Sequence, residues 1–298
     1  MNKSIYSLAM AGVFMLGALA EAASLPATLV MPGDKKWEGS IMSRDGEWIE
    51  FQTGTSPRPI RLGANTIVEL QFDIKLDQDR LNEMNQNREY ERVIDALNRA
   101  LDPYREYDDI PSNLTLYKSL LMELYYKTRD YEKTLEISAG LVQDDRDPDL
   151  QMKARIYGAL ALIDAGEADR AEALLKEYGW DEELNSESAP ERLYITAKLL
   201  ALKGQFAEAM ELAAYVVAFN SQDQEWMQPA ELLCAQVYTE LGKENPVMLD
   251  SAEEVIRQIS LLYKNTNEDD QAQQLKLRID ELRAEQELNK SIEESEEA

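Results

Sequence analysis

The densest group of carboxylates in the chain lies in residues 144–149, which read DDRDPD. Aspartates spaced two residues apart are typical of the first half of a calcium-binding loop. A loop in this register would need glycine where the chain has Leu150 and glutamate where it has Ile156. The same residues suit a turn in which Asp147 caps a helix that begins with Pro148. We therefore predict a helix start here and no metal ion, with a calcium loop as the alternative.

Histidine and cysteine, on which many catalytic sites depend, are absent or isolated in this chain. The chain has no histidine, which removes the commonest general base and every Ser-His or Cys-His pair. Its one cysteine, Cys234, lies in the apolar stretch 230–235, which predicts a buried and inert thiol. The sequence contains no phosphate-binding glycine loop, HExxH, GxSxG or CxxC motif. We expect a protein that is not an enzyme and uses no cofactor.

The charge of the chain restricts its partners. It has 57 acidic and 31 basic side chains, a formal net charge of -26, and a pI near 4.4. A surface this acidic repels phosphate groups, which disfavours nucleic acid and anionic lipid surfaces as partners. At the same time, 44% of the residues are hydrophobic, which is enough to build a buried core. The composition favours a protein or peptide partner.

The N-terminal segment, residues 1–22, has the pattern of an export signal. Lys3 supplies a positive start, residues 5–19 are apolar, and Ala20-Glu21-Ala22 fits the small-x-small rule for cleavage. The apolar run is short for a membrane-spanning helix, although an uncleaved anchor is the alternative. The segment has no cysteine that could carry a lipid. We expect removal of residues 1–22 and a periplasmic or otherwise exported protein with no transmembrane segment after that removal.

Residues 24–74 differ in composition from the rest of the chain and predict a small β module. Glycines and prolines divide this stretch into short pieces. Asp45-Gly46 lies between the segments 37–42 and 48–52, an arrangement that indicates a hairpin. In the segment 48–52 apolar and polar side chains alternate, so one face of that strand is expected to be buried. Four or five short strands favour an SH3-like barrel or a curled sheet.

Two positions in this module carry further expectations. Pro57 and Pro59 cannot donate hydrogen bonds to a neighbouring strand, so the strand after them should start late or lie at an edge. Trp37 and Trp48 are expected in the core of the module, and the alternative is that one of them is exposed and binds a partner.

A short motif recurs through the long, glycine-poor part of the chain that follows. The interval from Gly166 to Gly204 equals the interval from Gly204 to Gly242. Arg129 falls in nearly the same phase before Gly166, and Arg88 precedes Arg129 by a slightly longer interval. Such periodicity predicts an array of similar structural units stacked in sequence order.

The motif indicates helical hairpins. Glycine readily adopts the left-handed conformation that ends a helix, as we expect at Gly166, Gly204 and Gly242. The aromatic side chain two residues later, Phe206, is expected to wedge between the helices. A small residue three positions further on, Ala209, lets the two helix backbones approach closely.

This pattern resembles the tetratricopeptide family. The residues that carry the resemblance are the turn 204–209, GQFAEA, together with Leu121 and Tyr125 before the aromatic Tyr131. The repeat is somewhat longer than the repeat of that family, and the family's first-helix tryptophan is absent. The resemblance implies a mostly α protein in which about five hairpins form a solenoid over residues 77–284.

The end of the array has a second resemblance. Residues 252–283 are similar to the last repeat and closing helix of periplasmic tetratricopeptide proteins, such as the outer-membrane assembly component of the BamD type and the Tol-Pal accessory proteins. This implies work in assembly or maintenance of the cell envelope. Residues 285–298 are acidic and are expected to form a frayed or disordered tail.

In tetratricopeptide solenoids the first helix of each hairpin lines the inner groove, and this resemblance places six residues there. They are Tyr126, Lys127, Lys153, Tyr194, Lys198 and Gln236. The lysines would form a positive strip in an acidic chain, and the tyrosines would add amphipathic contacts. We therefore expect a scaffold or adaptor that binds an acidic or carboxylate-bearing peptide. The alternative is an architectural subunit that attaches to an envelope or cell-wall complex through its β module.

Overall fold

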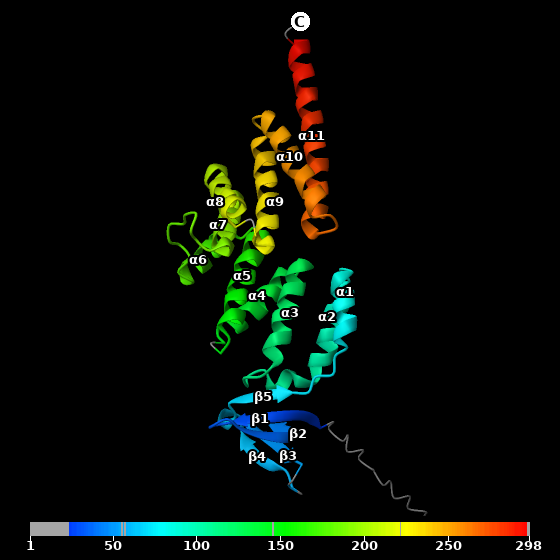
Figure 1. The fold of residues 1–298 in the computed structure, drawn as a ribbon, viewed down its shortest axis with the longest axis vertical. Helices are drawn as coiled ribbons and strands as arrows, with labels where there is room; N and C mark the ends of the chain where they lie inside the picture. Colours follow the sequence, from blue (N-terminus) through cyan, green and yellow to red (C-terminus); the bar gives the residue numbers. More distant parts are fainter. Residues whose placement is uncertain (1–23, 55, 57, 145, 221, 297–298) are drawn as a thin grey trace, which may run out of the picture. The chain divides into compact units, whose positions relative to one another are not determined.

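The computed structural model describes residues 24–296 except 55, 57, 145 and 221 (Figure 1). The predicted export signal lies outside the described residues. The protein is mostly α: a five-stranded antiparallel sheet is followed by a sequential array of helical hairpins. The chain divides into two compact units. The first contains the sheet and residues 98–114, and the second contains residues 78–97 and the chain from residue 115 onward.

The sheet has the strand order β4-β3-β2-β1-β5, with every neighbouring pair antiparallel. Four strands form a meander, and the fifth returns to pair with the first after a 3₁₀ turn at Ala64–Thr66. This order agrees with the predicted SH3-like module. The strands are β1 (Leu25–Met31), β2 (Lys35–Asp45), β3 (Trp48–Thr53), β4 (Ile60–Gly63) and β5 (Glu69–Phe72).

Two sequence predictions for this sheet are confirmed. The Asp45-Gly46 turn joins β2 to β3, and Gly46 has the positive φ of 59° that glycine accepts without a steric clash. After the proline-containing connection, the next strand starts late, at Ile60, and it lies at the edge of the sheet. Proline is compatible with such an edge because no donor is needed on its open side.

The expected core position of Trp48 is wrong. Ile49 and Phe51 are fully buried, and residues alternate across a strand, so Trp48 is on the opposite face with 47% of its surface exposed. Trp37 on β2 is half-buried. The Arg61 guanidinium lies 5.0 Å from the centre of the Trp48 ring, a cation–π contact that covers part of the indole.

Residues 98–114 complete the core of the first unit, so this unit is larger than the β module predicted for residues 24–74. The rings of Tyr104 and Tyr107 lie 4.7 and 5.7 Å from the ring of Phe72 on β5. Arg44 on β2 forms two 2.6 Å bonds with the carboxylate of Asp109. A sheet this small buries too little apolar surface by itself, which is why a following segment must supply aromatic side chains.

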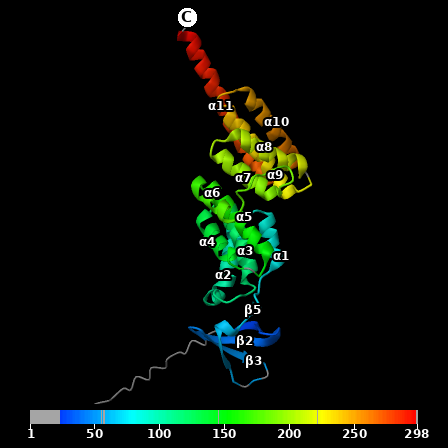
Figure 2. The same ribbon diagram turned by 90° about the vertical axis from the view of Figure 1, so that its left-hand side faces the viewer.

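In the described part of the chain, the array consists of five helical hairpins and a closing helix, as the repeat predicts. The hairpins are α1 (Gln78–Gln86) with α2 (Tyr90–Leu101), α3 (Leu114–Lys127) with α4 (Tyr131–Val142), α5 (Pro148–Asp164) with α6 (Ala168–Glu177), α7 (Pro190–Leu202) with α8 (Phe206–Phe219), and α9 (Gln224–Leu241) with α10 (Val247–Leu262); α11 (Asn267–Glu296) closes the array. Helices α7, α8, α9 and α10 pack consecutively, each on the next (Figure 2).

The hairpin turns show why the motif recurs. Arg88, Arg129, Gly166 and Gly204 all have positive φ angles, of 58°, 62°, 79° and 76°, and each ends the first helix of its hairpin. Five residues after each turn, the second helix carries a side chain that is buried against its neighbours. These buried residues are Val93, Thr134, Ala171 and Ala209. Close approach of the two helices requires this site to be filled by a compact side chain.

Gly242 departs from this pattern. Its φ is -64°, in the right-handed region, so the prediction that it takes the left-handed conformation is wrong. The chain between α9 and α10 continues in turns as far as Pro246, which means that a longer connection reverses the chain there. The capping prediction at Asp147 is confirmed, because its carboxylate accepts bonds of 3.1 Å from the backbone N–H groups of Asp149 and Leu150.

Helix α11 packs on α9 and α10 through an apolar core that includes Leu249, Ile256, Ile259, Ala272 and Ile279. The helix continues to Glu296, through most of the segment for which the sequence analysis expects a frayed or disordered tail, and it extends past α10 (Figure 1).

Cys234 is buried in α9, and burial raises the pKa of its thiol to about 11, consistent with an inert packing residue. No helix in the described part of the chain has both the length and the apolar character needed to cross a bilayer.

Candidate functional site

The second unit contains a cavity of about 680 Å³. Most of its lining comes from the first helix of every hairpin, namely α1, α3, α5, α7 and α9. The turns after α1 and α3, the first residues of α2 and α4, and the start of α11 with the two residues before it complete the lining. First helices lie on the same side of a hairpin array, so their side chains converge on one concave surface. The cavity is therefore the inner surface of the array.

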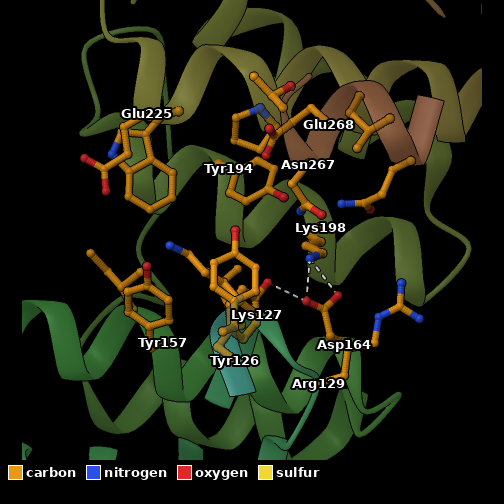
Figure 3. A pocket seen from close by; sticks show the side chains of 18 of the residues that line it. Tyr126, Lys127, Arg129, Tyr157, Asp164, Tyr194, Lys198, Glu225, Asn267 and Glu268 are labelled. Atoms are coloured by element: carbon orange, nitrogen blue, oxygen red, sulfur yellow. Dashed lines mark hydrogen bonds and ion pairs between the residues drawn. The ribbon is translucent and has the colours of Figure 1, made fainter. Parts of the chain in front are cut away.

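Aromatic side chains form much of the cavity wall (Figure 3). The ring of Tyr126 lies 5.3 Å from that of Tyr157 and 6.1 Å from that of Tyr131. On the facing wall, the rings of Tyr194 and Trp226 are 5.8 Å apart. Tyrosine and tryptophan offer large, stiff contact surfaces with a polar edge, which is the composition found at the centres of binding interfaces.

Asp164, the last residue of α5, connects three helices inside the cavity. The hydroxyl of Tyr126 on α3 donates to its carboxylate at 2.5 Å, and the Lys198 ammonium on α7 lies 2.6 Å away (Figure 3). Burial, together with the negative charge of Asp164, raises the pKa of Tyr126 well above its usual value. The phenol therefore stays protonated at neutral pH and remains a hydrogen-bond donor.

Lys198 is held as a cation by its surroundings. Burial acts to lower the pKa of Lys198, but the electrostatic effects of Tyr194 and Asp164 and the bond to Asp164 outweigh it, so the pKa is raised. The ammonium also lies 5.8 Å from the centre of the Tyr194 ring. Because its charge is matched by Asp164, Lys198 is better suited to fixing the shape of the cavity than to attracting an anion.

Lys127 and Arg129 are the less compensated cations of the cavity. Lys127 stacks on the Tyr90 ring at 5.3 Å, and burial lowers its pKa, with Glu268 acting in the opposite direction. Within the described residues, the side chain of Arg129 makes no hydrogen bond or ion pair. An anion bound next to these two side chains would be attracted by positive charge that the protein itself does not fully neutralise.

Arginine is an unusual residue for the turn positions 88 and 129. A side chain in the left-handed region costs on the order of 1–2 kcal/mol, which glycine avoids, and glycine is present at the equivalent Gly166 and Gly204. Both arginine turns line the cavity, whereas neither glycine turn does. Backbone strain retained at a cavity is a pointer to function, because the side chain is kept despite the cost.

Five of the six residues predicted for the groove line this one cavity: Tyr126, Lys127, Tyr194, Lys198 and Gln236. Lys153 does not join them and instead pairs with Glu123. The lysines therefore do not form the expected uniform positive strip. The charged lining residues are four cations and three carboxylates, a net charge of +1, in a chain of net charge -26: Arg88, Lys127, Arg129 and Lys198 against Asp164, Glu225 and Glu268.

The sequence reasoning missed three important parts of the site. Asp164 immediately precedes a recognised turn, and its position at the end of a first helix could have indicated that it faces inward. Trp226 lies near the start of α9, outside the region in which the motif was aligned. The first turn of α11 belongs to the end of the array, so no repeat spacing could have placed it beside α1.

No protein-family model matches the chain, and no curated protein is significantly similar to it in sequence.

Proposed function

We propose that this protein is a non-catalytic adaptor that binds a short segment of another polypeptide in the cavity of its helical array. The observation that carries the proposal is the convergence of aromatic side chains and incompletely neutralised cations on one concave surface. A volume of about 680 Å³ is within the range of cavities that enclose small ligands, and it suits a few amino-acid residues.

The charges of the cavity favour an acidic segment or a free C-terminal carboxylate. Lys127 and Arg129 can accept such a group without breaking an ion pair, whereas Lys198 is already bonded to Asp164. The aromatic walls around Tyr157 and Trp226 suit an apolar side chain next to that carboxylate. Aromatic contact supplies affinity and the cations supply orientation, the usual division between apolar and charged groups at binding sites.

The bonded group of Tyr126, Asp164 and Lys198 favours a role in binding over a role in catalysis. Its carboxylate receives bonds from both Tyr126 and Lys198, which leaves it poorly placed to act as a base. The segment 1–22 and the resemblance to periplasmic tetratricopeptide proteins favour work outside the cytoplasm, in the assembly or maintenance of the cell envelope.

The proposal is tested with the chain from residue 24 onward and a fluorescent library of hexapeptides, presented once with a free C-terminal carboxylate and once as the amide. We expect fluorescence anisotropy to select carboxylate peptides with apolar or aromatic side chains. Lys127→Met should weaken this binding, and Lys153→Met, which removes the same charge outside the cavity, should not. Equal binding of acids and amides, or equal effects of the two lysine variants, would contradict the proposal.

A second candidate function has one specific observation in its favour, the exposed Trp48 on the outer face of the sheet. In this alternative, the β module attaches the protein to an envelope or cell-wall complex and the helices act as a spacer. Trp48→Ala should then release the protein from its envelope fraction, while Lys127→Met should leave it attached. The reverse result would favour the cavity.

A further inference from the structure

A contact between the first and last parts of the array closes one side of the cavity. The guanidinium of Arg88, in the turn after α1, bonds to the carbonyl oxygen of Asn265 and to the carboxylate of Asp270. These partners are far away in the sequence, at the start of α11. A stacked array of hairpins has an open groove unless its ends meet, so this contact helps to turn the groove into a cavity.

The segment that Arg88 holds is a defined structural piece. The carboxylate of Asp269 accepts from the backbone N–H of Asn265 at 3.1 Å, and the hydroxyl of Thr266 accepts from the N–H of Asp269 at 3.2 Å. These bonds cap α11, so residues 265–271 consist of the two residues before the helix and its first turn. Several residues of this segment line the cavity, so the segment is one of its walls.

The backbone on both sides of the contact is in the left-handed region. Arg88 has a φ of 58° and Asn265 a φ of 66°, while the equivalent turns away from the cavity use Gly166 and Gly204. Glycine would adopt this conformation at position 88 with less strain than arginine. We therefore attribute the presence of arginine to the contacts of its side chain. The bonds to residues 265 and 270 are the interactions that this side chain makes with described residues.

The contact is also one that can break. The side chains of Arg88 and Asp270 are 32% and 58% exposed, so water and salt compete with their ion pair. Apolar packing of α11 on α9 and α10 lies further along the helix, at residues such as Ala272 and Ile279, and does not depend on Arg88.

We propose that residues 265–271 form a gate of the cavity that Arg88 holds shut and that opens when its bonds to Asn265 and Asp270 break. The inference deepens the proposed function, since it describes how a polypeptide would enter, but its test requires no ligand. Failure of the gate and failure of peptide binding are therefore distinguishable.

Hydrogen–deuterium exchange of the chain from residue 24 onward tests the gate. In Arg88→Gly, which keeps the left-handed turn accessible, we expect the amides of residues 266–271 to exchange about threefold faster or more. Asp270→Ala should have the same effect. Sodium chloride should speed exchange in the unmodified chain and have little further effect in Arg88→Gly, because screening weakens the bond that this variant already lacks.

Arg129→Gly is the matched control, because it removes the same charge from an equivalent left-handed turn that also lines the cavity. It should leave exchange at residues 266–271 unchanged. Equal exchange in all the variants, or equal acceleration by Arg88→Gly and Arg129→Gly, would overturn the gate.

Acrylamide quenching of Trp226 provides a second measurement. Trp226 lines the cavity, and the other three tryptophans, Trp37, Trp48 and Trp180, can be replaced by phenylalanine. Arg88→Gly should make Trp226 more accessible to this neutral quencher, whereas Arg129→Gly should not. If the Trp180 replacement unfolds the chain, the exchange experiment decides alone, since it retains every tryptophan.

Discussion

Arg129 and Gly204 occupy the same backbone conformation in equivalent turns, with φ angles of 62° and 76°. One turn joins α3 to α4 beside the cavity, and the other joins α7 to α8 away from it. The fold therefore needs a left-handed residue at both places but does not need arginine at either. The hairpin requires the left-handed backbone, whereas the arginine side chain is found at the turn beside the cavity.

Arg129→Gly is expected to stabilise the protein while impairing its binding. Relief of the left-handed strain should raise the free energy of unfolding by about 1 kcal/mol. Urea denaturation measures this change, with Arg129→Ala as the control, because alanine removes the guanidinium without relieving the strain. A glycine variant no more stable than the alanine variant would mean that this turn holds no strain that glycine relieves.

Removal of the Lys198 charge is expected to destabilise the second unit. Lys198→Met would leave Asp164 with its phenol donor but without a counter-ion in a partly buried site, at a cost of about 2 kcal/mol. The double variant Asp164→Asn with Lys198→Met should recover much of that loss, because the uncompensated charge is removed. Additive losses in a double-mutant cycle would show that the two side chains act independently.

Peptide binding is expected to depend on pH through Lys127. Burial lowers the pKa of Lys127 below its usual value of 10.5, and a bound carboxylate would raise it again. Affinity for a carboxylate peptide should then be full at pH values below the pKa of Lys127 in the unbound protein. It should fall as the pH rises through that pKa, because Lys127 loses its charge. Lys127→Arg should flatten this fall, because guanidinium stays protonated over the same range.

Calorimetric titrations of one N-acetylated carboxylate peptide at increasing pH measure this dependence. The same alkaline loss in Lys127→Arg and in the unmodified chain would assign the titration to another group, and Lys127 would no longer explain it.

Phe206→Asp should weaken the fourth hairpin. Phe206 begins α8 and is half-buried against the main core of the second unit, so the substitution removes apolar contact and places a charge beside that core. We expect a loss of about 2 kcal/mol in stability. Phe219→Asp, at the other end of the same helix, changes a residue that is 64% exposed and should cost much less in thermal melting. Similar melting temperatures for the two variants would show that Phe206 does not brace the hairpin.

The hairpin array could be predicted because its main determinants are local. Turn conformation and the compact side chain five residues later recur along the sequence, and together they set the phase in which Tyr126, Tyr194 and Gln236 face inward. The repeat does not predict the connection after α9, because that connection is longer than the other hairpin turns. Gly242 has the right residue type for a left-handed turn, but the connection that contains it does not use one.

The remaining features depend on contacts between distant parts of the chain. Repeat spacing identifies Arg88 as a turn residue, but it does not predict a bond to Asp270 at the far end of the array. Likewise, the pairing of Lys153 with Glu123 depends on how neighbouring hairpins pack, and the phase taken from the tetratricopeptide resemblance could not predict it. In the β module, burial of Ile49 and Phe51 decides that Trp48 faces outward.

The central claim, that the cavity binds a carboxylate-bearing peptide, is tested most directly by a thermodynamic cycle. One selected peptide, as the free acid and as the amide, is titrated by calorimetry against the unmodified chain and against Arg129→Gly. Amidation should weaken binding to the unmodified chain by about tenfold and should weaken binding to Arg129→Gly much less, because the guanidinium that faces the carboxylate has been removed. An equal loss on amidation in both proteins would place the carboxylate away from Arg129 and contradict the proposed site.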